Sequence, residues 1–380
     1  MNQISMNFPG KLVFGEGCTS DFITGFSGLP FKRIVMVSDP CLTTKAEMIR
    51  DEWGKSGIAC LINATIAGEP GISDYLTVLG DAESFGAEAV VGIGGGSVLD
   101  VAKLVATLFN TGLPVESVFG NDKIGKRALY LACLPTTAGT GSEVSPNSIL
   151  SCPGENMKKA VISPALIPDA TYVDPLLTHS VPPDVTASTG IDALTHCIEA
   201  YANKNAHPMT DLYALEGIRL IFNHLGAAFR DGSDSEARKS VSLGSLYGGL
   251  CLGPVNTAAV HALAYPLGSR FHIPHGISNA MLLPHVLEFN LPAAVGRYAS
   301  IARIIGVRED NDLYAAETGI RLITGLCREV EVPGKLSGYG VKPDDVPFLA
   351  GSALTVQRLL KNNLREIREN DALAIYNKLF

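Results

Sequence analysis

The chain has 380 residues, of which 46% are hydrophobic and 18% are charged. This length exceeds what a single hydrophobic core usually supports, so it predicts two domains, and the composition is typical of a packed globular protein. The formal net charge of −8 argues against nucleic acid or an anionic membrane surface as a partner. The sequence also lacks an uninterrupted apolar run of the ~18 residues that a membrane span needs.

The N-terminus and the cysteines indicate a cytoplasmic protein. Residues 1–17 lack the basic start and the following apolar block of a signal peptide. The eight cysteines are scattered, form no CxxC pair and mostly lie in apolar runs. Such a distribution is typical of reduced, buried thiols.

The first half of the chain alternates apolar, β-rich runs with helical patterns. Predicted strands cover 11–17, 33–39, 58–65, 87–96 and 128–135, and predicted helices cover 73–86 and 97–110. Most of these strands are apolar throughout, as expected for parallel strands with helices on both faces of the sheet. The alternation predicts a doubly wound, Rossmann-like α/β domain over residues 1–183.

From about residue 184 the strand pattern stops and helical patterns follow. Three prolines within residues 174–185 mark the expected boundary. Predicted helices cover 185–202, 210–230, 235–252, 256–265, 277–289, 292–305, 311–329 and 357–377. We expect an all-helical domain over residues 184–380 and a ligand site in the cleft between the two domains.

A glycine-rich turn follows the predicted strand 87–96. Gly94, Gly95 and Gly96 lie between this strand and a helix that begins near Ser97. Glycine allows close approach of the backbone, and a helix N-terminus offers free N–H groups and partial positive charge. The turn can therefore bind a pyrophosphate. A tight turn without a ligand is the alternative.

Two further features favour a dinucleotide. Asp39 ends the strand 33–39, although the acidic residue of an ordinary Rossmann unit follows the glycines by ~20 residues. A carboxylate there can bind a ribose 2′-hydroxyl and would repel the 2′-phosphate of NADP; capping a turn is the alternative. The loop 134–145, "LPTTAGTGSEVS", carries small hydroxyl residues after another buried strand and can offer donors to phosphates and a nicotinamide, unless it is a plain surface turn.

The second half contains candidate metal ligands. Asp192 and His196 are four residues apart in a predicted helix, so their side chains share one face, about 5–6 Å apart at Cβ. His261 and His275 follow in "VHALAYPLGSRFHIPHGISN". One carboxylate and three imidazoles suit Fe(II) or Zn(II). A histidine satisfied within the core is the alternative for each, and spacing alone does not bring His261 to Asp192.

These motifs together resemble the iron-containing (group III) alcohol dehydrogenases over essentially the full chain. The family's pieces occur in order, as "FGEG", "GGGSVLDVAK", "PTTAGTGSEVS", "ATYVDP", "TGIDALTHCIEAY" and "HALAYPLG…HIPHGISNAMLLPHV". The resemblance implies an N-terminal dinucleotide domain, a helical metal-binding domain and a homodimer or larger homo-oligomer. It implies hydride transfer between a nicotinamide and a small alcohol, diol or hydroxy acid whose oxygen is polarised by the metal.

The resemblance also implies roles for individual residues. The implied metal ligands are Asp192, His196, His261 and His275. The implied contacts to NAD are Asp39, Gly94, Gly95, Gly96, Ser97, Asp100, Thr136, Thr137, Thr140, Asn147 and Lys158.

One position departs from the family pattern. Many relatives carry a second histidine four residues after the equivalent of His261, where this chain has Tyr265. The Tyr265 hydroxyl, His272 or solvent is then expected to assist proton transfer, and a place in the pocket wall is the alternative for Tyr265. Glu199 lies two turns after Asp192, where it either orients a metal ligand or forms a helix salt bridge.

Rival functions have their own requirements. A maleylacetate-reductase-like or glycerol-dehydrogenase-like oxidoreductase is the nearest rival, and the presence of all four ligands disfavours the former. A dehydroquinate-synthase-like lyase needs a cluster of basic residues for phosphate, whereas only Arg270 lies near the expected metal helices. A cofactor-binding protein without catalysis is the rival outside enzymes. Arg270 and His272 are candidates for recognising an anionic substrate, unless Arg270 lies on the surface.

Overall fold

The computed structural model describes residues 3–152 and 157–380 and separates into two compact units. The first unit contains Asn7–Thr137 and Ser142–His179. The second contains Ser180–Phe380 together with the loop Ala138–Gly141 and the chain up to Met6. Within the described residues, no helix has the length and apolarity that crossing a membrane requires.

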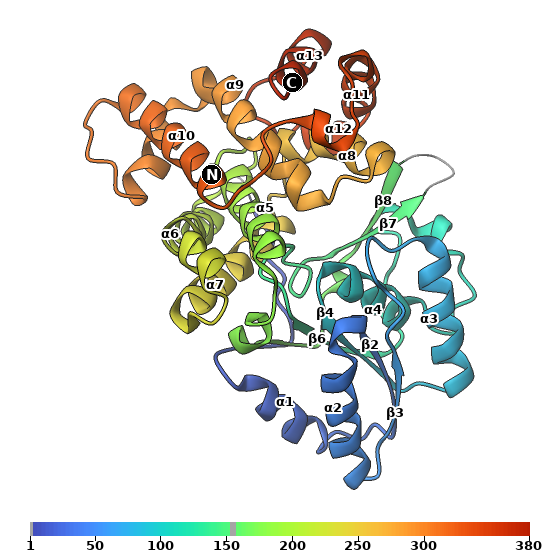
Figure 1. Cartoon of the computed structure of the whole chain (residues 1–380). Coiled ribbons are helices and arrows are strands. Elements are labelled where there is room, and N and C mark those ends of the chain that lie inside the picture. Colours follow the sequence, from blue (N-terminus) through green and yellow to red (C-terminus); the bar gives the residue numbers. More distant parts are fainter. Residues whose placement is uncertain (1–2, 153–156) are drawn as a thin grey trace. The chain divides into compact units, whose positions relative to one another are not determined.

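The first unit is built on a six-stranded parallel sheet (Figure 1). Its strands are β1 (Lys11–Phe14), β2 (Arg33–Ser38), β3 (Ala59–Asn63), β4 (Ala89–Gly94), β6 (Tyr130–Pro135) and β9 (Ala170–Val173). Their order is β1-β9-β6-β4-β2-β3, and each pairing is parallel. Counted from β2, this is the doubly wound 2-1-3-4-5 order, in which ligands bind where the winding reverses, between β2 and β4.

Helices cover both faces of this sheet. On one face, Ile34 and Met36 of β2 share a core with α1 (Cys18–Phe26) and α2 (Thr43–Lys55). On the other, Val35 and Val37 pack with α3 (Ile72–Phe85) and α4 (Gly96–Leu108). Successive residues of a strand point to opposite faces of the sheet. Since helices cover both faces, the residues on each face of β2 are apolar, and the strand is apolar throughout. The predicted doubly wound domain is confirmed; β9, α1 and α2 were not predicted.

A second, small sheet also lies outside the predictions. It contains β5 (Gly120–Asn121), β7 (Asn147–Cys152) and β8 (Met157–Ile162), and β7 pairs with β8 antiparallel. The residues of β7 that point inward are Ser148, Leu150 and Cys152. Since a polar residue starts this buried series, the period-two apolar pattern that identifies a strand is weak.

The second unit is helical, as predicted. Its helices are α5 (Pro183–Tyr201), α6 (Pro208–Arg230), α7 (Ser235–Leu252), α8 (Ala259–Phe271), α9 (His275–Ile304), α10 (Asp312–Glu329), α11 (Val346–Leu354), α12 (Gln357–Leu360) and α13 (Glu369–Asn377). Helix α5 packs against α6, α7 and α9, and it is buried almost all round from Thr186 to Tyr201. Polar residues on such a helix need partners inside the protein.

Three of the predicted helices are joined or divided in the structure. The segments 277–289 and 292–305 belong to one helix, α9, which continues through Pro292 because Ala294, Tyr298 and Ala299 bury its next turns in the core. The segment 357–377 is instead divided into α12 and α13. Between them, the side-chain amide of Asn363 donates a hydrogen bond to the backbone oxygen of Arg365. Asparagine side chains often form such local bonds to the backbone, which compete with the hydrogen bonds of a helix.

Candidate metal centre

Helix α5 carries three buried polar residues on one face. Asp192, His196 and Glu199 are 2%, 5% and 5% exposed. A buried carboxylate or imidazole is costly unless other groups bind it, so this face predicts a set of specific partners. The partners come from the loop before α8, from α8 itself, from the start of α9 and from the loop 138–141.

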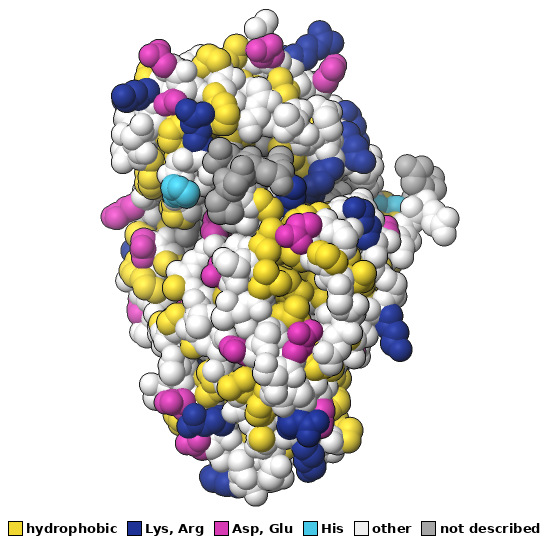
Figure 2. All heavy atoms as spheres, turned by 90° about the vertical axis from the view of Figure 1, so that its right-hand side faces the viewer, with side chains coloured by type: hydrophobic (Ala, Val, Ile, Leu, Met, Phe, Trp, Pro, Cys, Tyr) yellow, Lys and Arg dark blue, Asp and Glu magenta, His cyan; other side chains and the backbone are white. Residues whose placement is uncertain are grey.

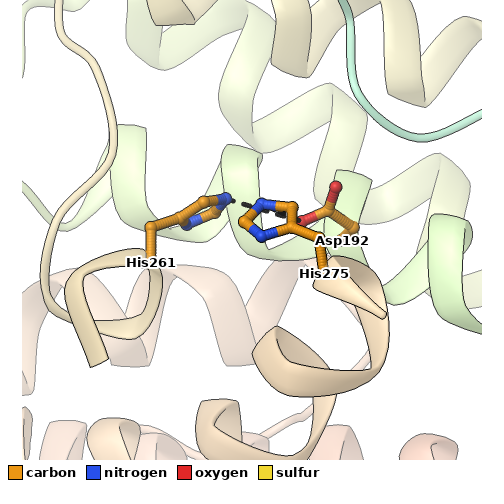
Figure 3. Close-up of side chains that lie close together, drawn as sticks. All are labelled: Asp192, His261 and His275. Carbon is orange, nitrogen blue, oxygen red and sulfur yellow. Dashed lines mark ion pairs between the residues drawn. The ribbon is translucent and has the colours of Figure 1, made fainter. Parts of the chain in front are cut away.

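The four predicted metal ligands gather in one place. Oδ1 of Asp192 lies 3.5 Å from Nε2 of His261 and 3.9 Å from Nε2 of His275 (Figure 3). Nε2 of His196 lies 3.9 Å from the same oxygen, and its ring stacks on that of His261 with centroids 4.7 Å apart. The tightest group, with donor atoms all within 4.8 Å of one another, contains Asp192, His261 and His275. Asp192, His261 and His275 thus present one oxygen and two nitrogens to a common centre, and Nε2 of His196 lies beside it.

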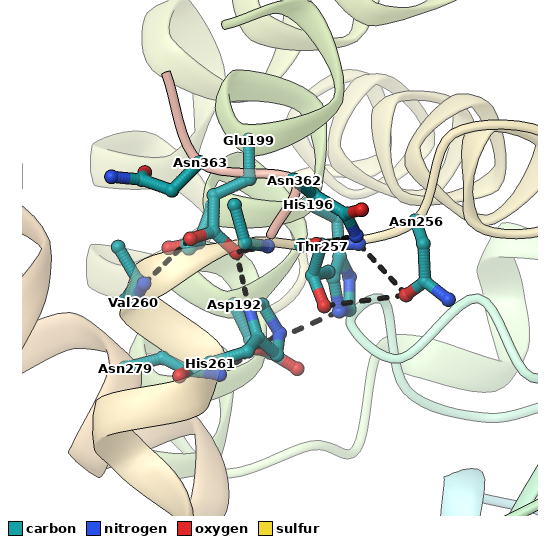
Figure 4. Close-up of polar contacts among 12 residues, drawn as sticks. Asp192, His196, Glu199, Asn256, Thr257, Val260, His261, Asn279, Asn362 and Asn363 are labelled. Atoms are coloured by element: carbon teal, nitrogen blue, oxygen red, sulfur yellow. Dashed lines mark hydrogen bonds and ion pairs between the residues drawn. The ribbon is translucent and has the colours of Figure 1, made fainter. Parts of the chain in front are cut away.

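Glu199 orients His261. Its Oε2 lies 2.6 Å from Nδ1 of His261 and accepts a hydrogen bond from the backbone N–H of Ala258 at 3.0 Å (Figure 4). Its Oε1 accepts one from the N–H of Val260 at 2.6 Å. Because these N–H groups belong to the unpaired first turn of α8, the carboxylate also stabilises the start of that helix. An ionised carboxylate only accepts, so Nδ1 of His261 donates and Nε2 is the nitrogen that faces Asp192 and can bind a metal once it is deprotonated.

Asn279 and Gly139 hold the other ligands. The amide nitrogen of Asn279 donates to Oδ1 of Asp192 at 2.6 Å and lies 3.1 Å from Nε2 of His275. The Gly139 carbonyl lies 3.2 Å from Nδ1 of His196 and accepts a hydrogen bond from it. This contact leaves the Nε2 of His196 to face Asp192. Sequence reasoning missed Asn279, which lies four residues after His275 and therefore on the same face of α9.

The electrostatics favour positive charge at the centre. Burial opposes ionisation of Asp192, but His196 and His275 outweigh it and hold the pKa of Asp192 well below its ordinary value. Burial likewise opposes protonation of His261, but Glu199 and Asp192 outweigh it and raise the pKa of His261 to about 9. For His196 burial dominates over Asp192, and its pKa is lowered. A divalent cation would supply the positive charge that these carboxylates attract.

The arrangement fits a transition metal. Nε2 of His261 is buried and has no hydrogen-bond partner within the described chain, although buried polar atoms are nearly always paired. This nitrogen faces Oδ1 of Asp192, which also lies 3.9 Å from Nε2 of His275. A set of three imidazole nitrogens and one carboxylate oxygen is nitrogen-rich for Mg²⁺ or Ca²⁺ and suits Fe(II) or Zn(II).

The two candidates for proton transfer lie in different surroundings. The Tyr265 ring lies beside His275, with centroids 6.1 Å apart, and its hydroxyl accepts a hydrogen bond from Arg358 at 2.8 Å. His272 is exposed and ends α8 with a left-handed backbone, φ 54°. Tyr265 is therefore the candidate that lies beside one of the predicted metal ligands.

Asp39 and the glycines 94–96, predicted to bind NAD, lie at the reversal of the sheet, after β2 and β4. Asp39 follows β2, and its backbone N–H donates to the Ile93 carbonyl in the neighbouring strand β4. Gly94 ends β4, and a Cβ there would lie 2.7 Å from Val98, so only glycine allows α4 to begin so close to the strand. Asp39 precedes the glycines in sequence because β2 is the first strand of a 2-1-3 arrangement and β4 is the third.

The side chain of Asp39 also caps a turn. Its Oδ1 accepts a hydrogen bond from the N–H of Cys41 at 3.0 Å. Asp39 therefore does cap a turn, which was the alternative to cofactor binding. Its other carboxylate oxygen can still accept a hydrogen bond from a ribose hydroxyl. Gly95 is the N-cap of α4, whose first helical residues are Gly96 and Ser97, so the free N–H groups of this helix begin at the predicted glycines.

The loop 134–145 is divided between the units. The N–H of Thr136 donates to the Gly94 carbonyl, and the Thr137 side chain lies against Gly95, which joins this part of the loop to the glycine turn. Thr140 belongs to the stretch Ala138–Gly141 of the helical unit. There Gly141 has φ +62°, and a Cβ on it would lie 2.3 Å from the backbone of Gly249.

Asp100 is held inside the first unit. It accepts hydrogen bonds from the Ser142 hydroxyl at 2.5 Å and from the N–H of Ile149 at 2.9 Å. Buried Lys103, which sequence reasoning missed, donates to the Ser142 carbonyl at 2.8 Å and lies 3.8 Å from Asp100. These bonds fasten the segment 142–149 to α4, so Asp100 acts on the loop, and a direct contact with the cofactor stays a prediction.

Asn147 and Lys158 lie in β7 and β8. The Oδ1 of Asn147 is buried without a partner in the described chain, which favours a ligand there. Nζ of Lys158 pairs with Glu69 at 2.5 Å. Its charge is thus paired within the first unit, and a contact with the cofactor stays a prediction.

Family profiles cover both units. The profile described as iron-containing alcohol dehydrogenase matches residues 9–175, and that of the C-terminal part of the Fe-containing alcohol dehydrogenase family matches residues 186–380. The chain belongs to the iron-containing alcohol dehydrogenase family. The predicted family, its fold and its activity class, the NAD-linked interconversion of alcohols and aldehydes by an oxidoreductase, are confirmed.

Similar proteins agree with this family. The chain is 36% identical over 381 residues to long-chain-alcohol dehydrogenase 1 of Geobacillus thermodenitrificans (strain NG80-2), covering 98% of this chain and 96% of that protein. The crystal structure of a 1,3-propanediol oxidoreductase has a TM-score of 0.95 at 31% identity and covers 100% of both chains. A sulfoacetaldehyde reductase from Bifidobacterium kashiwanohense, solved in complex with NAD+, has a TM-score of 0.89 at 26% identity and covers 100% of this chain and 99% of that one.

Proposed function

We propose that this alcohol dehydrogenase uses Asp192, His196, His261 and His275 to bind Fe(II), or Zn(II) where zinc is the available metal. The observation that carries the proposal is the buried, unpartnered Nε2 of His261, which faces Asp192 and is flanked by the other two imidazoles. When bound, the metal supplies Lewis-acid polarisation of the substrate oxygen, and the nicotinamide supplies or accepts the hydride.

The protein's own residues fix the geometry of this chemistry. Glu199 keeps His261 in one tautomer, and Asn279 keeps Asp192 in one orientation, so little reorganisation is needed when the ligands bind. Because Asp192, His196 and His261 are buried, water reaches this side of the centre poorly. His275, with a side chain that is 26% exposed, marks the side by which a substrate approaches.

In this proposal, the Tyr265 hydroxyl assists proton transfer. Its hydroxyl can exchange a proton with a substrate or with solvent near His275, whereas His272 is exposed at the end of α8. Tyr265 thus takes the place of the second histidine found in many relatives.

We expect the cofactor-binding residues to be those predicted from the sequence, with Asp39 selecting NAD over NADP. In the variant Asp39→Gly, the ratio of kcat/KM with NADP to that with NAD should rise about tenfold or more, because the carboxylate no longer repels a 2′-phosphate. Steady-state kinetics with both cofactors measure this ratio. Replacement of Asp51, an exposed acidic residue on α2, is the matched control and should leave the ratio unchanged. An Asp39→Gly enzyme with wild-type preference would contradict the contact.

The substrate proposed is a small alcohol, diol or hydroxy acid and its aldehyde. Similar proteins carry names for long-chain alcohols, 1,3-propanediol and sulfoacetaldehyde, which spans neutral and anionic compounds. A maleylacetate-reductase-like activity is disfavoured by the complete ligand set. The test is a panel of alcohols, diols and ω-hydroxy acids with NAD, after loading with Fe(II) and separately with Zn(II). Absence of turnover across the panel with either metal would contradict the proposal.

Location and assembly complete the proposal. We propose a cytoplasmic enzyme, because all eight cysteines are free and seven of them are buried or partly buried. Acidic and basic side chains are mixed on the face that Figure 2 shows, which agrees with a small-molecule partner rather than nucleic acid. A homodimer or larger homo-oligomer follows from the family resemblance, and light scattering of the purified protein measures it.

A further inference from the structure

An arginine of α12 lies near the accessible side of the metal centre. Arg358 of α12 is partly buried, and its Nη2 donates to the Tyr265 hydroxyl at 2.8 Å. Its guanidinium carbon lies 5.8 Å from the centre of the same ring. Within the described chain it forms no ion pair with an aspartate or glutamate. A guanidinium has five N–H donors, so four remain for another acceptor.

The guanidinium of Arg358 lies on the side from which a substrate is expected to approach the metal. Tyr265, which it contacts, lies beside His275, and His275 is the most exposed of the four metal ligands. A substrate whose oxygen binds beside His275 therefore lies next to Tyr265, and Arg358 contacts the hydroxyl of this tyrosine. Partial burial strengthens an interaction between the guanidinium and an anion because solvent screens it less.

We propose that Arg358 binds the anionic end group of the substrate, so that the enzyme prefers short hydroxy acids, and the corresponding aldehyde acids, over neutral alcohols of equal length. The planar fork of a guanidinium matches a carboxylate or a sulfonate with two parallel hydrogen bonds. This inference rests on the proposed function and names the substrate class of the same site.

Arg270, the arginine considered from sequence, is arranged differently. It pairs with Asp345 at 3.5 Å and stacks on Phe348, with its guanidinium carbon 4.1 Å from the ring centre. Its side chain is 42% exposed. Its charge is already compensated, so the structure assigns anion recognition to Arg358, and Arg270 becomes a matched control.

The experiment compares two substrates that differ at one end, 3-hydroxypropanoate and 1,3-propanediol, with NAD and the metal-loaded enzyme. In Arg358→Met, the ratio of kcat/KM for the acid to that for the diol should fall about 10- to 100-fold, the range expected for losing hydrogen bonds to a charged group. Arg358→Lys should keep part of the preference. Arg270→Met should keep the wild-type ratio.

A second variant separates recognition from positioning. Tyr265→Phe removes the hydroxyl that Arg358 contacts but leaves the guanidinium in place, so the acid-to-diol ratio should stay within about threefold of the wild type, well short of the loss from a buried charged contact. If Tyr265→Phe lowers this ratio as much as Arg358→Met does, Arg358 only positions the tyrosine and the inference is wrong.

A binding measurement makes the test independent of turnover. Propanoate should raise the melting temperature of the metal-free wild type more than propanol does, because a ligand stabilises the state that binds it, and Arg358→Met should remove that difference. If no member of the wider panel of alcohols, diols and hydroxy acids is turned over by the wild type, the proposed function fails, while the melting shift still decides the inference. If turnover is present and Arg358→Met keeps both the ratio and the melting shift, the inference alone fails.

Discussion

The variant Asp192→Asn is expected to lose its metal and to show a kcat/KM at least about 10³-fold below the wild type, a loss of ~4 kcal/mol within the several kcal/mol that a catalytic metal provides. Asp192 is the carboxylate around which the imidazoles gather, with His261 at 3.5 Å and His196 and His275 at 3.9 Å from the same oxygen. An amide keeps the size of the side chain but removes the only negative charge among the four ligands.

Metal analysis of the purified protein and steady-state kinetics measure this effect, and circular dichroism measures whether the chain still folds. Asp211→Asn is the matched control, because Asp211 is also largely buried in the helical unit and pairs with Arg297 at 2.6 Å. The control should retain its metal and most of its activity. Full metal content and wild-type turnover in Asp192→Asn would rule out the proposed centre.

Features formed by residues of a single helix or turn could be predicted from the sequence. The spacing of Asp192 and His196 is enough to put both on one face of α5, and the glycines 94–96 follow a strand whose apolar character is evident. The convergence of α5 with His261 and His275 depends on how three helices pack, which no local pattern contains. It was expected from the family resemblance rather than from spacing.

Alternatives left open by the sequence needed coordinates. Glu199 was equally consistent with a helix salt bridge, and the deciding contacts come from Ala258, Val260 and His261, about 60 residues away in the chain. The unusual order of Asp39 and the glycines has its explanation in the strand order, which follows from the pairing of β2 with β4.

The helix bounds show the same limit. Asn363 looks like one polar residue of a helix in the sequence, yet its amide also exchanges hydrogen bonds with Asn290, 73 residues away. Tertiary partners of this kind override the local pattern by which the segment 357–377 was predicted as one helix.

The variant Glu199→Gln is expected to bind the metal about 10- to 100-fold more weakly, the usual cost of removing a group that orients a metal ligand. Glu199 accepts three hydrogen bonds in a buried place, from Nδ1 of His261 and from the first turn of α8. Glutamine offers one oxygen and one NH₂ group, so at least one of these donors loses its acceptor. His261 then no longer holds one tautomer and one orientation.

The same substitution should change the pH dependence of metal binding. Glu199 is the largest influence that raises the pKa of His261, which is about 9 in the metal-free protein. A ligating imidazole must be neutral, so binding below pH 9 displaces a proton, and affinity should rise up to tenfold per pH unit and level off near pH 9. In Glu199→Gln the pKa of His261 is lower, and the affinity should level off at a lower pH. Calorimetry of metal binding in two buffers of different ionisation enthalpy counts the displaced protons.

The stability of the metal-free protein provides an independent check. Because the folded pKa of His261 is raised above the ordinary value of 6.5, its contribution to stability is fully present below pH 6.5 and is lost as the pH rises to about 9. The free-energy difference between wild type and Glu199→Gln should therefore shrink over that interval. Glu216→Gln, which removes an exposed partner of Arg219, should show no such dependence on pH between 6.5 and 9. If Glu199→Gln releases as many protons as the wild type on metal binding, and the stability difference between the two does not change with pH, then Glu199 only caps α8 and does not raise the pKa of His261.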